Sequence, residues 1–479
     1  MISKNLDNVN LDNFLVVIFG SGPAGITTAL ELEKKNIKCL IIEAGEENYS
    51  EESQELYQGK TIGDEIMPLS KSRLRQFGGT SGHWGGVSKP MEDYTLELWP
   101  IKPDDLKSYS KRTSEILNIN HQFRKAPLSQ FINQIEFQYS LVRFADKYKN
   151  HIKNSNNITL VLNTQLSHFV GDNNSIKYAL CISGKTKKKI KTKYFILACG
   201  GIENSRLLLW TKAKNRGFFN NNLPIGKYWM NHPHVLGGRG VISRKKLAEK
   251  MKNNFLGYRD WMHFSTTKEL MIKKEILSAT MHMLTQDVFR KDKIIDKEVM
   301  KDIICVAPKY GEKLIRTFHK KNFSCVNIFL SLEQEPIEQN KVVLDDKKDK
   351  FEIPKVKLFY KQTLQLLKTA KFFLEEFANL CVENDLGRIA IKDSIFNLEK
   401  LEPFANLEYG GGHHMGGTRM GTDKYKSVVN TDLKIHDIDN LYVSGSSNFF
   451  TSGYTNPTFT IIQFAIRLAE KLNERLRSA

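Results

Sequence analysis

The chain has 479 residues, of which 41% are hydrophobic and 26% charged, so it can bury a sizeable core and is neither disordered nor collagen-like. Its formal net charge is +18, but the lysines are spread along the whole sequence and no segment joins them to a recognisable nucleic-acid module. This distribution argues against nucleic acid as a partner. No apolar run approaches the roughly eighteen residues that a membrane-spanning helix needs.

The six cysteines do not have the spacing of a disulfide framework or a zinc site. No two of them form a C-x-x-C pair, and Cys39 lies within an apolar run, which is typical of buried thiols in a reducing compartment. The apolar stretch Phe14–Phe19 is too short for the core of a secretion signal. The sequence therefore predicts a cytoplasmic protein with neither a transmembrane segment nor a metal site.

The first predicted element is a buried strand over Phe14–Phe19, a continuous apolar run of the kind found in parallel sheets. A glycine-rich turn over residues 20–25 follows, then a helical pattern to Leu32 and a second buried strand over Lys38–Ile42. The result is a βαβ unit whose turn reads G-x-G-x-x-G. Glu43 follows 23 positions after the first of these glycines.

This βαβ unit has the fingerprint of a dinucleotide site. Gly20 permits the tight turn, Gly22 lets a pyrophosphate approach the backbone, and Gly25 allows the helix to pack closely on the strand. The phosphates then lie at the N-terminus of the helix, and Glu43 is placed to accept hydrogen bonds from a ribose. An ordinary βα turn is the alternative, but two flanking buried strands and the acidic residue make the fingerprint specific.

The middle of the chain is less regular. The patterns predict two helices, two strands and a third helix, in the order Leu106–Ile119, Phe131–Ile152, Ile158–Leu162, Phe195–Ala198 and Ile202–Trp210. From about Val235 to Leu401 the glycine content falls, and alternating Lys-rich segments predict an antiparallel sheet. The last eighty or so residues again have the pattern of the N-terminal βαβ unit, with a strand over Leu441–Gly445 and an amphipathic helix after Asn456-Pro457.

These elements predict an α/β fold for the nucleotide-binding part and an α+β organisation for the chain as a whole. A Rossmann-like nucleotide-binding domain is expected over residues 1–235 and 401–479, and residues 236–400 are expected to form an inserted substrate-binding domain on an antiparallel sheet. Residues 110–150 are a further candidate for the substrate side.

Four segments resemble the glucose–methanol–choline (GMC) flavin oxidoreductases. They are the fingerprint, the loop FGGTSGHWGG at 77–86, the segment LACGGIENSRLL at 197–208, and HMGGTRMG at 414–421 together with SGYTNPT at 452–458. Smaller matches at Trp99–Ile101, Met230–Pro233 and Glu333-Gln334 extend the resemblance over nearly the whole chain. The spellings G-G-T-S-x-H-W and H-x-G-G-T are most similar to the pyranose oxidase and glycoside oxidase branch.

The resemblance implies FAD as the cofactor. It assigns cofactor binding to Gly20, Gly22, Gly25, Glu43, Gly79, Thr80, Ser81, His83, Trp84, Gly85, Ala198, Gly445, Asn456, Pro457 and Thr458. The loop at 77–86 has five glycines in ten residues, so its bare backbone can lie against a planar ring. In the pyranose oxidase branch the histidine at the position of His83 can carry the flavin covalently. A covalent bond and a simple hydrogen bond near the ring are equally open for His83.

The resemblance also implies a catalytic pair. Oxidation of an alcohol by flavin needs a base for the hydroxyl proton, and an imidazole suits this task near neutral pH. The H-x-x-G-T register makes His414 the base, and Asn456, which lies 42 residues further on, would hold the alcohol oxygen. Because His413 directly precedes His414, a register shifted by one residue is the alternative.

The activity implied by the resemblance is FAD-dependent oxidation of a CH–OH group in a small sugar or polyol. The alternatives are oxidation of a choline-like or aromatic alcohol, a flavin-bearing lyase, and a non-catalytic FAD-binding protein. The sequence leaves the substrate, the electron acceptor and the oligomeric state undetermined.

Overall fold

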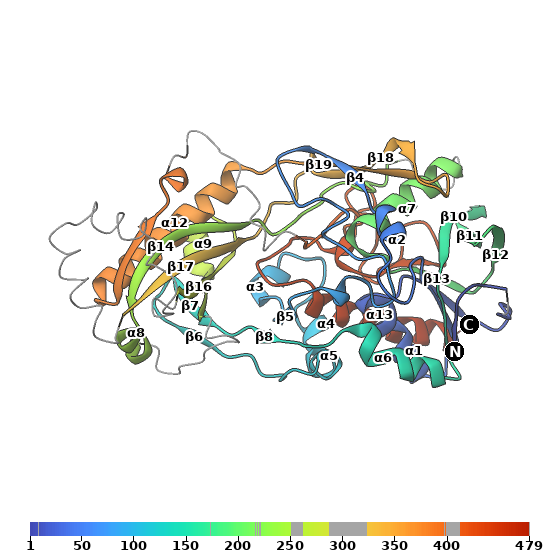
Figure 1. Cartoon of the computed structure of the whole chain (residues 1–479), viewed down its shortest axis with the longest axis horizontal. Helices are drawn as coiled ribbons and strands as arrows, with labels where there is room; N and C mark the ends of the chain where they lie inside the picture. The colour runs from blue at the N-terminus through green and yellow to red at the C-terminus, as the bar shows by residue number, and fades with distance from the viewer. Residues whose placement is uncertain are drawn as a thin grey trace.

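The computed structural model describes residues 1–250, 262–286, 323–398 and 412–478, apart from positions 8, 173, 216, 218, 220, 221 and 397. The described chain is elongated, with both termini beside a parallel sheet at one end and an antiparallel sheet under a long helix at the other (Figure 1).

The parallel sheet contains six strands in the order β1-β9-β3-β2-β13-β21. Their bounds are Ile2–Ser3, Ile158–Val161, Cys39–Ile42, Val16–Phe19, Tyr194–Leu197 and Leu441–Val443. All five pairings are parallel. Because the carboxyl ends of parallel strands share one edge, the loops that follow β2, β3, β13 and β21 meet there.

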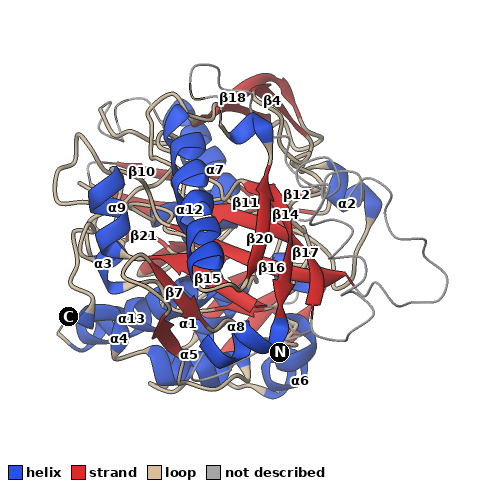
Figure 2. Ribbon diagram, turned by 90° about the vertical axis from the view of Figure 1, so that its left-hand side faces the viewer, coloured by secondary structure: helices blue, strands red, loops and turns tan. Residues whose placement is uncertain are grey.

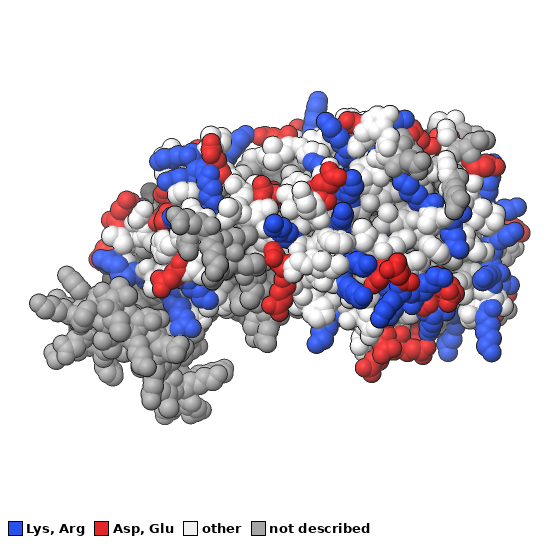
Figure 3. All heavy atoms as spheres, turned by 90° about the horizontal axis from the view of Figure 1, so that it is seen from above, with Lys and Arg blue, Asp and Glu red and all other residues white. Residues whose placement is uncertain are grey.

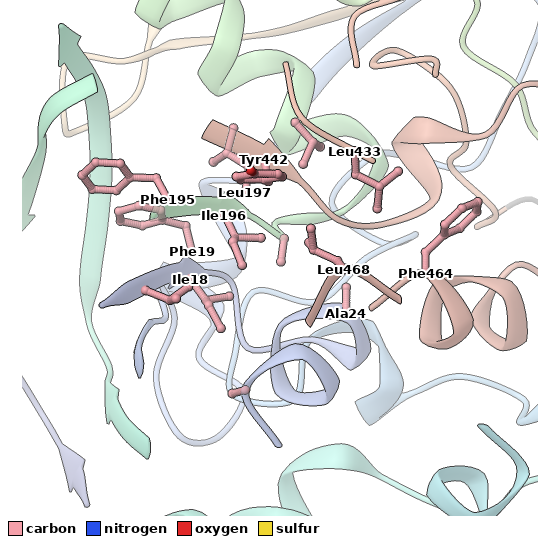
Figure 4. Packing of buried hydrophobic residues seen from close by; sticks show 14 of the residues in the cluster. Ile18, Phe19, Ala24, Phe195, Ile196, Leu197, Leu433, Tyr442, Phe464 and Leu468 are labelled. Carbon is pink, nitrogen blue, oxygen red and sulfur yellow. The ribbon is translucent and has the colours of Figure 1, made fainter. Parts of the chain in front are cut away.

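Helices cover one face of the parallel sheet and a small antiparallel sheet covers the other. Helix α1 (Pro23–Glu33) packs against α13 (Thr458–Arg477), so the two ends of the chain meet in one layer. On the opposite face lies the sheet β10-β11-β12 (Thr164–Asp172, Ser175–Ser183, Thr186–Ile190), whose Phe169 contacts Phe19 and Phe195 edge-on. Figure 4 shows Phe19 and Phe195 with the aliphatic residues of β2 and β13 between these layers.

The antiparallel sheet contains seven strands in the order β20-β14-β17-β16-β15-β7-β6. Their bounds are Gly387–Ile391, His234–Ser243, Phe323–Leu332, Ala279–Gln286, Met262–Thr266, Ile132–Ile135 and Lys125–Pro127. Helix α12 (Leu364–Glu383) lies across this sheet (Figure 2).

The two faces of the seven-stranded sheet differ in character. Phe264, Met281 and Leu330 are aligned across β15, β16 and β17, are fully buried, and belong to the apolar cluster that includes the inner side of α12. The next residues in register, His263, His282 and Phe329, point to the opposite face because successive side chains of a strand alternate. The sheet therefore has one apolar face under α12 and one face rich in histidine.

Smaller elements complete the fold. Strands β18 (Lys341–Lys348) and β19 (Pro354–Tyr360) form a third sheet with β4 (Gly59–Gly63), and β5 (Val87–Ser88) pairs with β8 (Gln138–Tyr139). The remaining helices are α2 (Glu51–Glu55), α3 (Asp93–Leu96), α4 (Asp104–Lys107), α5 (Ser110–Leu117), α6 (Phe144–Asn154), α7 (Gly200–Lys214), α8 (Arg244–Lys250) and α9 (Lys268–Lys274), with short 3-10 turns at Gly79–Gly82, Asp393–Ile395 and Ser446–Asn448.

One predicted helix is wrong over its first half. Residues 131–152 were expected to be helical, but Ile132–Ile135 and Gln138–Tyr139 are strands, and the helix begins only at Phe144. Strand β7 pairs with β15, so tertiary pairing overrides the local pattern. Residues 125–135 thereby belong to the antiparallel sheet. The division of the chain into domains at 1–235, 236–400 and 401–479 stays a prediction.

On the face seen in Figure 3, Lys and Arg are interspersed with Asp and Glu. Ion pairs among the described residues include Lys107 with Asp93 at 2.7 Å and Arg124 with Glu136 at 2.8 Å. Among the described helices, none is long and apolar enough to cross a membrane.

Candidate functional site

A deep cavity lies at the carboxyl edge of the parallel sheet, where the turns after its central strands converge. Its lining comes from the turn before α1, the end of β3, the 79–87 loop, the start of β10, the N-terminus of α7, residues 412–414, residues 444–446 and the start of α13. Thirteen of the predicted cofactor residues line it: Gly20, Gly22, Glu43, Gly79, Thr80, Ser81, Trp84, Gly85, Ala198, Gly445, Asn456, Pro457 and Thr458.

The three fingerprint glycines have different surroundings. A Cβ on Gly20, whose φ is +104°, would lie 2.4 Å from the carbonyl oxygen of Ala198, and a Cβ on Gly25 would lie 1.9 Å from the carbonyl oxygen of Gly20. A Cβ on Gly22 would meet no atom of the described chain within 4 Å, although Gly22 lines the cavity. Gly20 and Gly25 are therefore required by the packing of the turn, whereas a side chain at Gly22 would occupy the space of a ligand.

Glu43 closes the turn from the end of β3. Its Oε2 accepts hydrogen bonds from the backbone N–H of Ser21 at 3.0 Å and from the Ser21 hydroxyl at 2.6 Å, and its Oε1 accepts from the N–H of Gly45 at 2.8 Å. The carboxylate is thus held rigidly at the cavity wall. Carboxylate oxygens have further lone pairs, so Glu43 can still accept bonds from ribose hydroxyls.

The glycine-rich loop packs directly on the fingerprint turn. A Cβ on Gly79 would lie 3.1 Å from the Cα of Gly22, and the Gly78 N–H donates to the Ser21 carbonyl oxygen at 3.1 Å. Trp84 lines the cavity and its indole N–H donates to the Val142 carbonyl oxygen at 2.9 Å.

His83 does not lie where the resemblance implied. It follows the short 3-10 turn Gly79–Gly82, its side chain is exposed, and it is absent from the described residues that line the cavity, although Ser81 and Trp84 on either side are present. The tight turn directs Ser81 inward, where its hydroxyl donates to Gly78, and leaves His83 facing outward. His83 is thus not part of the described cavity wall, and its contact with the cofactor stays a prediction.

The inner end of the cavity contains a histidine beside Asn456, but this histidine is His413. The Asn456 Nδ2 lies 3.3 Å from the His413 Nε2, and the His413 Nδ1 lies 2.9 Å from the Nδ1 of His232. The His232 Nε2 in turn lies 3.3 Å from the carbonyl oxygen of Ser452. Residues 232, 413, 452 and 456 thus form one hydrogen-bonded row.

His414 points in another direction. Its Nε2 lies 2.8 Å from the hydroxyl of Ser72, and its Nδ1 has no hydrogen-bond partner among the described residues. Met415, the next residue, is bonded in both directions to Met230 and fixes the path of this segment. Neighbouring side chains on such an extended stretch face opposite ways, so only one of the two histidines can face Asn456. The expected His414–Asn456 pair is corrected to His413–Asn456.

The histidines of this site are neutral near pH 7. Burial lowers the pKa of His413 well below its ordinary value, and the neighbouring His232, His234 and His414 lower it further. Burial also lowers the pKa of His232 to about 3 and that of His414 to about 3. A neutral imidazole has one lone pair, so each of these rings can accept one hydrogen bond and donate another.

Several cavity residues were not predicted from the sequence. Tyr57, Arg73 and Gln165 line the cavity from segments that carry no motif. Arg73 forms a buried ion pair with Glu203 at 2.8 Å and stacks over the ring of Tyr57, 4.0 Å from its centroid. No spacing pattern in the sequence links Arg73 to Glu203, so neither the burial of Arg73 nor its ion pair could be predicted.

The residues present fit FAD. The open space at Gly22 and the uncapped N-terminus of α1 suit a pyrophosphate, and rigid Glu43 suits a ribose. Two buried polar atoms at the cavity wall, the His414 Nδ1 and the Ser444 hydroxyl, have no partner within the described part of the chain and are available to a polar ligand. No cluster of three potential metal-ligating side chains occurs in the described part of the chain.

Comparison with known proteins agrees with this site. Residues 333–465 match the family described as GMC oxidoreductase. The chain is 25% identical over 295 residues to 2-methyl-1,2-propanediol dehydrogenase of Mycolicibacterium austroafricanum, covering 60% of this chain and 49% of that protein. It is 24% identical over 312 residues to the fructose dehydrogenase large subunit of Gluconobacter japonicus, covering 61% and 49%. The chain thus spans about half the length of these relatives.

A shorter match is closer in sequence. Over 80 residues the chain is 39% identical to C-glycoside 3-oxidase of Arthrobacter globiformis, covering 16% of this chain and 14% of that protein. Among solved structures, pyridoxine 4-oxidase from Mesorbium loti has a TM-score of 0.61 at 12% identity, covering 96% of this chain and 99% of that one. A formate oxidase has a TM-score of 0.59 at 14% identity, covering 97% and 99%. The fold is therefore the predicted one, and the cavity fits the FAD that the family resemblance implies.

Proposed function

We propose that this chain is a GMC oxidoreductase and that it oxidises a CH–OH group of a small polyol or sugar-type alcohol to a carbonyl group. The relatives named above carry the names of a diol, a sugar and a glycoside, which supports this class of substrate. Bound FAD supplies the acceptor for the hydride that leaves the alcohol carbon.

The observation that carries this proposal is the His413–Asn456 pair at the cavity wall. His413 is the base: its Nε2 takes the hydroxyl proton, and the carbon loses its hydride with the electron pair of the C–H bond. Asn456 donates its Nδ2–H to the same oxygen while negative charge develops on it. Both side chains line the cavity and lie 3.3 Å apart, so one alcohol oxygen bound in the cavity can be within hydrogen-bond reach of both.

His414 has a different role in this scheme. Its bond to Ser72 and the close approach of Gly201 hold residue 414 in place: a Cβ on Gly201 would lie 2.1 Å from the carbonyl oxygen of His414. His414 thus shapes the cavity wall beside His413. Its free Nδ1 is available to the cofactor and takes no proton from the substrate.

The substrate class is tested by a panel of D-glucose, D-fructose, methyl glucoside, 1,2-propanediol, benzyl alcohol and choline. Each is mixed anaerobically with the purified holoprotein, and bleaching of the flavin absorbance is followed. The panel reports reduction of the cofactor without any knowledge of the electron acceptor. We expect bleaching by a sugar or diol; bleaching by choline or benzyl alcohol alone would favour the non-sugar alternative, and no bleaching by any of them would contradict the proposal.

The compartment is a further proposal. Cys39, Cys181, Cys199 and Cys381 are free thiols, which supports a reducing environment such as the cytoplasm.

A further inference from the structure

The row from Ser452 to Asn456 fixes which nitrogen of each histidine carries a proton. The Ser452 carbonyl oxygen can only accept a hydrogen bond, so the His232 Nε2 must carry the hydrogen that points at it. His232 is fully buried and neutral, so its Nδ1 is then a lone pair. Two nitrogens 2.9 Å apart need one hydrogen between them, and only the His413 Nδ1 can supply it.

The same reasoning determines the free lone pair of His413. Because the neutral ring carries its hydrogen on Nδ1, its Nε2 is unprotonated, and it faces the amide of Asn456 at the cavity wall. This is the nitrogen that must take the substrate proton. In the other tautomer of His413, the Nε2 would carry a hydrogen and have no lone pair for the substrate.

We propose that His232 is a positioning residue that holds His413 in its base-competent tautomer through the Nδ1–Nδ1 hydrogen bond. The inference rests on the proposed function, since it assigns His232 a role only through His413. When the His413 Nε2 takes the proton, the ring becomes an imidazolium, and its Nδ1–H donates more strongly to the His232 lone pair. His232 thereby also stabilises the charge that forms on the base.

The row ends at a group that cannot take a proton. A backbone carbonyl accepts hydrogen bonds without becoming protonated, so His232 does not pass the proton onward, and the proton leaves His413 through the cavity. Ser452 is itself fixed, because its hydroxyl accepts the Gln334 N–H at 3.0 Å and the Gln334 Oε1 accepts the Asn231 N–H at 2.8 Å. The acceptor for His232 is therefore rigid.

His234 provides a matched control. Its ring lies 5.9 Å from the His413 ring, centroid to centroid, in an edge-on contact, and its Nε2 has no hydrogen-bond partner in the residues that the structure describes. His232 lies at 5.0 Å, also edge-on, but shares the hydrogen bond. The two histidines therefore touch the same ring and differ in whether they fix its tautomer.

The first test measures the limiting rate of flavin reduction with the panel member that bleaches the flavin fastest. His232→Leu should retain FAD and lower this rate roughly ten- to a hundredfold, the effect of losing a hydrogen bond to a group that becomes charged. His232→Asn should stay within roughly fivefold of the wild type, because its Oδ1 can accept from the His413 Nδ1 in place of the lost nitrogen. His234→Asn should change the rate by a similarly small factor. Equal losses in His232→Asn and His232→Leu would overturn the inference.

The second test needs no turnover. In long-range ¹H–¹⁵N spectra of the histidine-labelled holoprotein, His413 should carry its proton on Nδ1 alone, and His413→Gln assigns its signals. His413 should show a mixture of tautomers in His232→Leu and the single tautomer in His232→Asn. A wild-type His413 protonated on Nε2 would refute the inference even if His232→Leu fails to fold.

His413→Ala distinguishes failure of the inference from failure of the proposed function. If this variant reduces its flavin at the wild-type rate, the proposed function fails. If its flavin reduction is slow while that of His232→Leu is normal, only the role of His232 fails.

Discussion

The parallel sheet and the seven-stranded antiparallel sheet show two ways in which sequence relates to structure in this chain. At the edge of the parallel sheet, backbone shapes the candidate site: the turns after β2 and β13 approach so closely that a side chain at Gly20 would lie 2.4 Å from the carbonyl oxygen of Ala198. On the antiparallel sheet, the surroundings of a side chain depend on which face it occupies, as with His263 and Phe264 on neighbouring positions of β15. Close backbone contacts require glycine at fixed positions and so produce a recognisable motif. The choice of a sheet face produces only an alternation of residue types along a strand.

The largest expected effect is a difference in stability between substitutions at two glycines of the same turn, Gly25 and Gly22. Gly25→Val should abolish FAD binding and lower the free energy of unfolding by roughly 3 kcal/mol or more, because its side chain collides with the backbone of Gly20. Gly22→Val should also lose FAD but fold normally, since Gly22 has an extended backbone (φ −75°) and open space at its Cβ. Flavin absorbance and urea unfolding of the apoproteins measure both. Equal destabilisation by the two substitutions would contradict this assignment.

The second prediction concerns the base. His413→Ala should bind FAD but slow its reduction roughly a hundredfold or more, the usual contribution of a general base. His414→Ala should slow it less than tenfold, because His414 bonds to Ser72 and not to Asn456. Anaerobic rapid mixing measures both rates. If the two variants exchange their effects, the base is His414, as the H-x-x-G-T register implies.

The third prediction compares the two faces of the antiparallel sheet. Phe264→Ala should lower the free energy of unfolding by roughly 3–5 kcal/mol, because Phe264 is fully buried and packs on Phe377 of α12. Phe329→Ala should cost less than half as much, since Phe329 is only half-buried on the opposite face, where it stacks on His282. Urea titrations give both values. A larger loss from Phe329→Ala would show that the faces are assigned wrongly.

The fourth prediction concerns pH. Burial lowers the pKa of His232 to about 3, of His234 to about 4 and of His414 to about 3 in the folded protein, whereas the unfolded chain titrates near the ordinary value of about 6.5. Below about pH 6.5 the unfolded state therefore binds protons that the folded state excludes, so stability falls as the pH is lowered towards 4. Urea unfolding between pH 7 and 5, where most carboxylates stay ionised, should show this decline and show it reduced in His234→Asn. A stability independent of pH in this window would contradict it.

The smallest effect is expected at the loop that covers the fingerprint turn. Because His83 faces outward, acid precipitation should leave the flavin in the supernatant, and His83→Ala should bind FAD as the wild type does. Trp84→Ala is the contrasting variant, since Trp84 lines the cavity and should weaken FAD binding. Flavin that stays in the protein pellet, and is lost from it in His83→Ala, would establish a covalent bond.

The sequence by itself was enough to predict the βαβ unit of the parallel sheet and its fingerprint turn. Buried parallel strands read as continuous apolar runs, and a tight turn before a helix requires glycine at fixed spacing, so β2, α1, β3 and Glu43 were all predictable from local pattern. The family resemblance added FAD and most of the cavity wall by the same kind of local match.

Tertiary structure alone decided the rest. Strand β7 was mistaken for a helix because its pairing with β15 involves residues more than a hundred positions away. The choice between His413 and His414 depended on Met415 being bonded to Met230, and the partner of the base, His232, comes from a distant segment of the chain. A motif fixes residue types along the chain, but which of two adjacent side chains faces a cavity is set by contacts that only the folded chain makes.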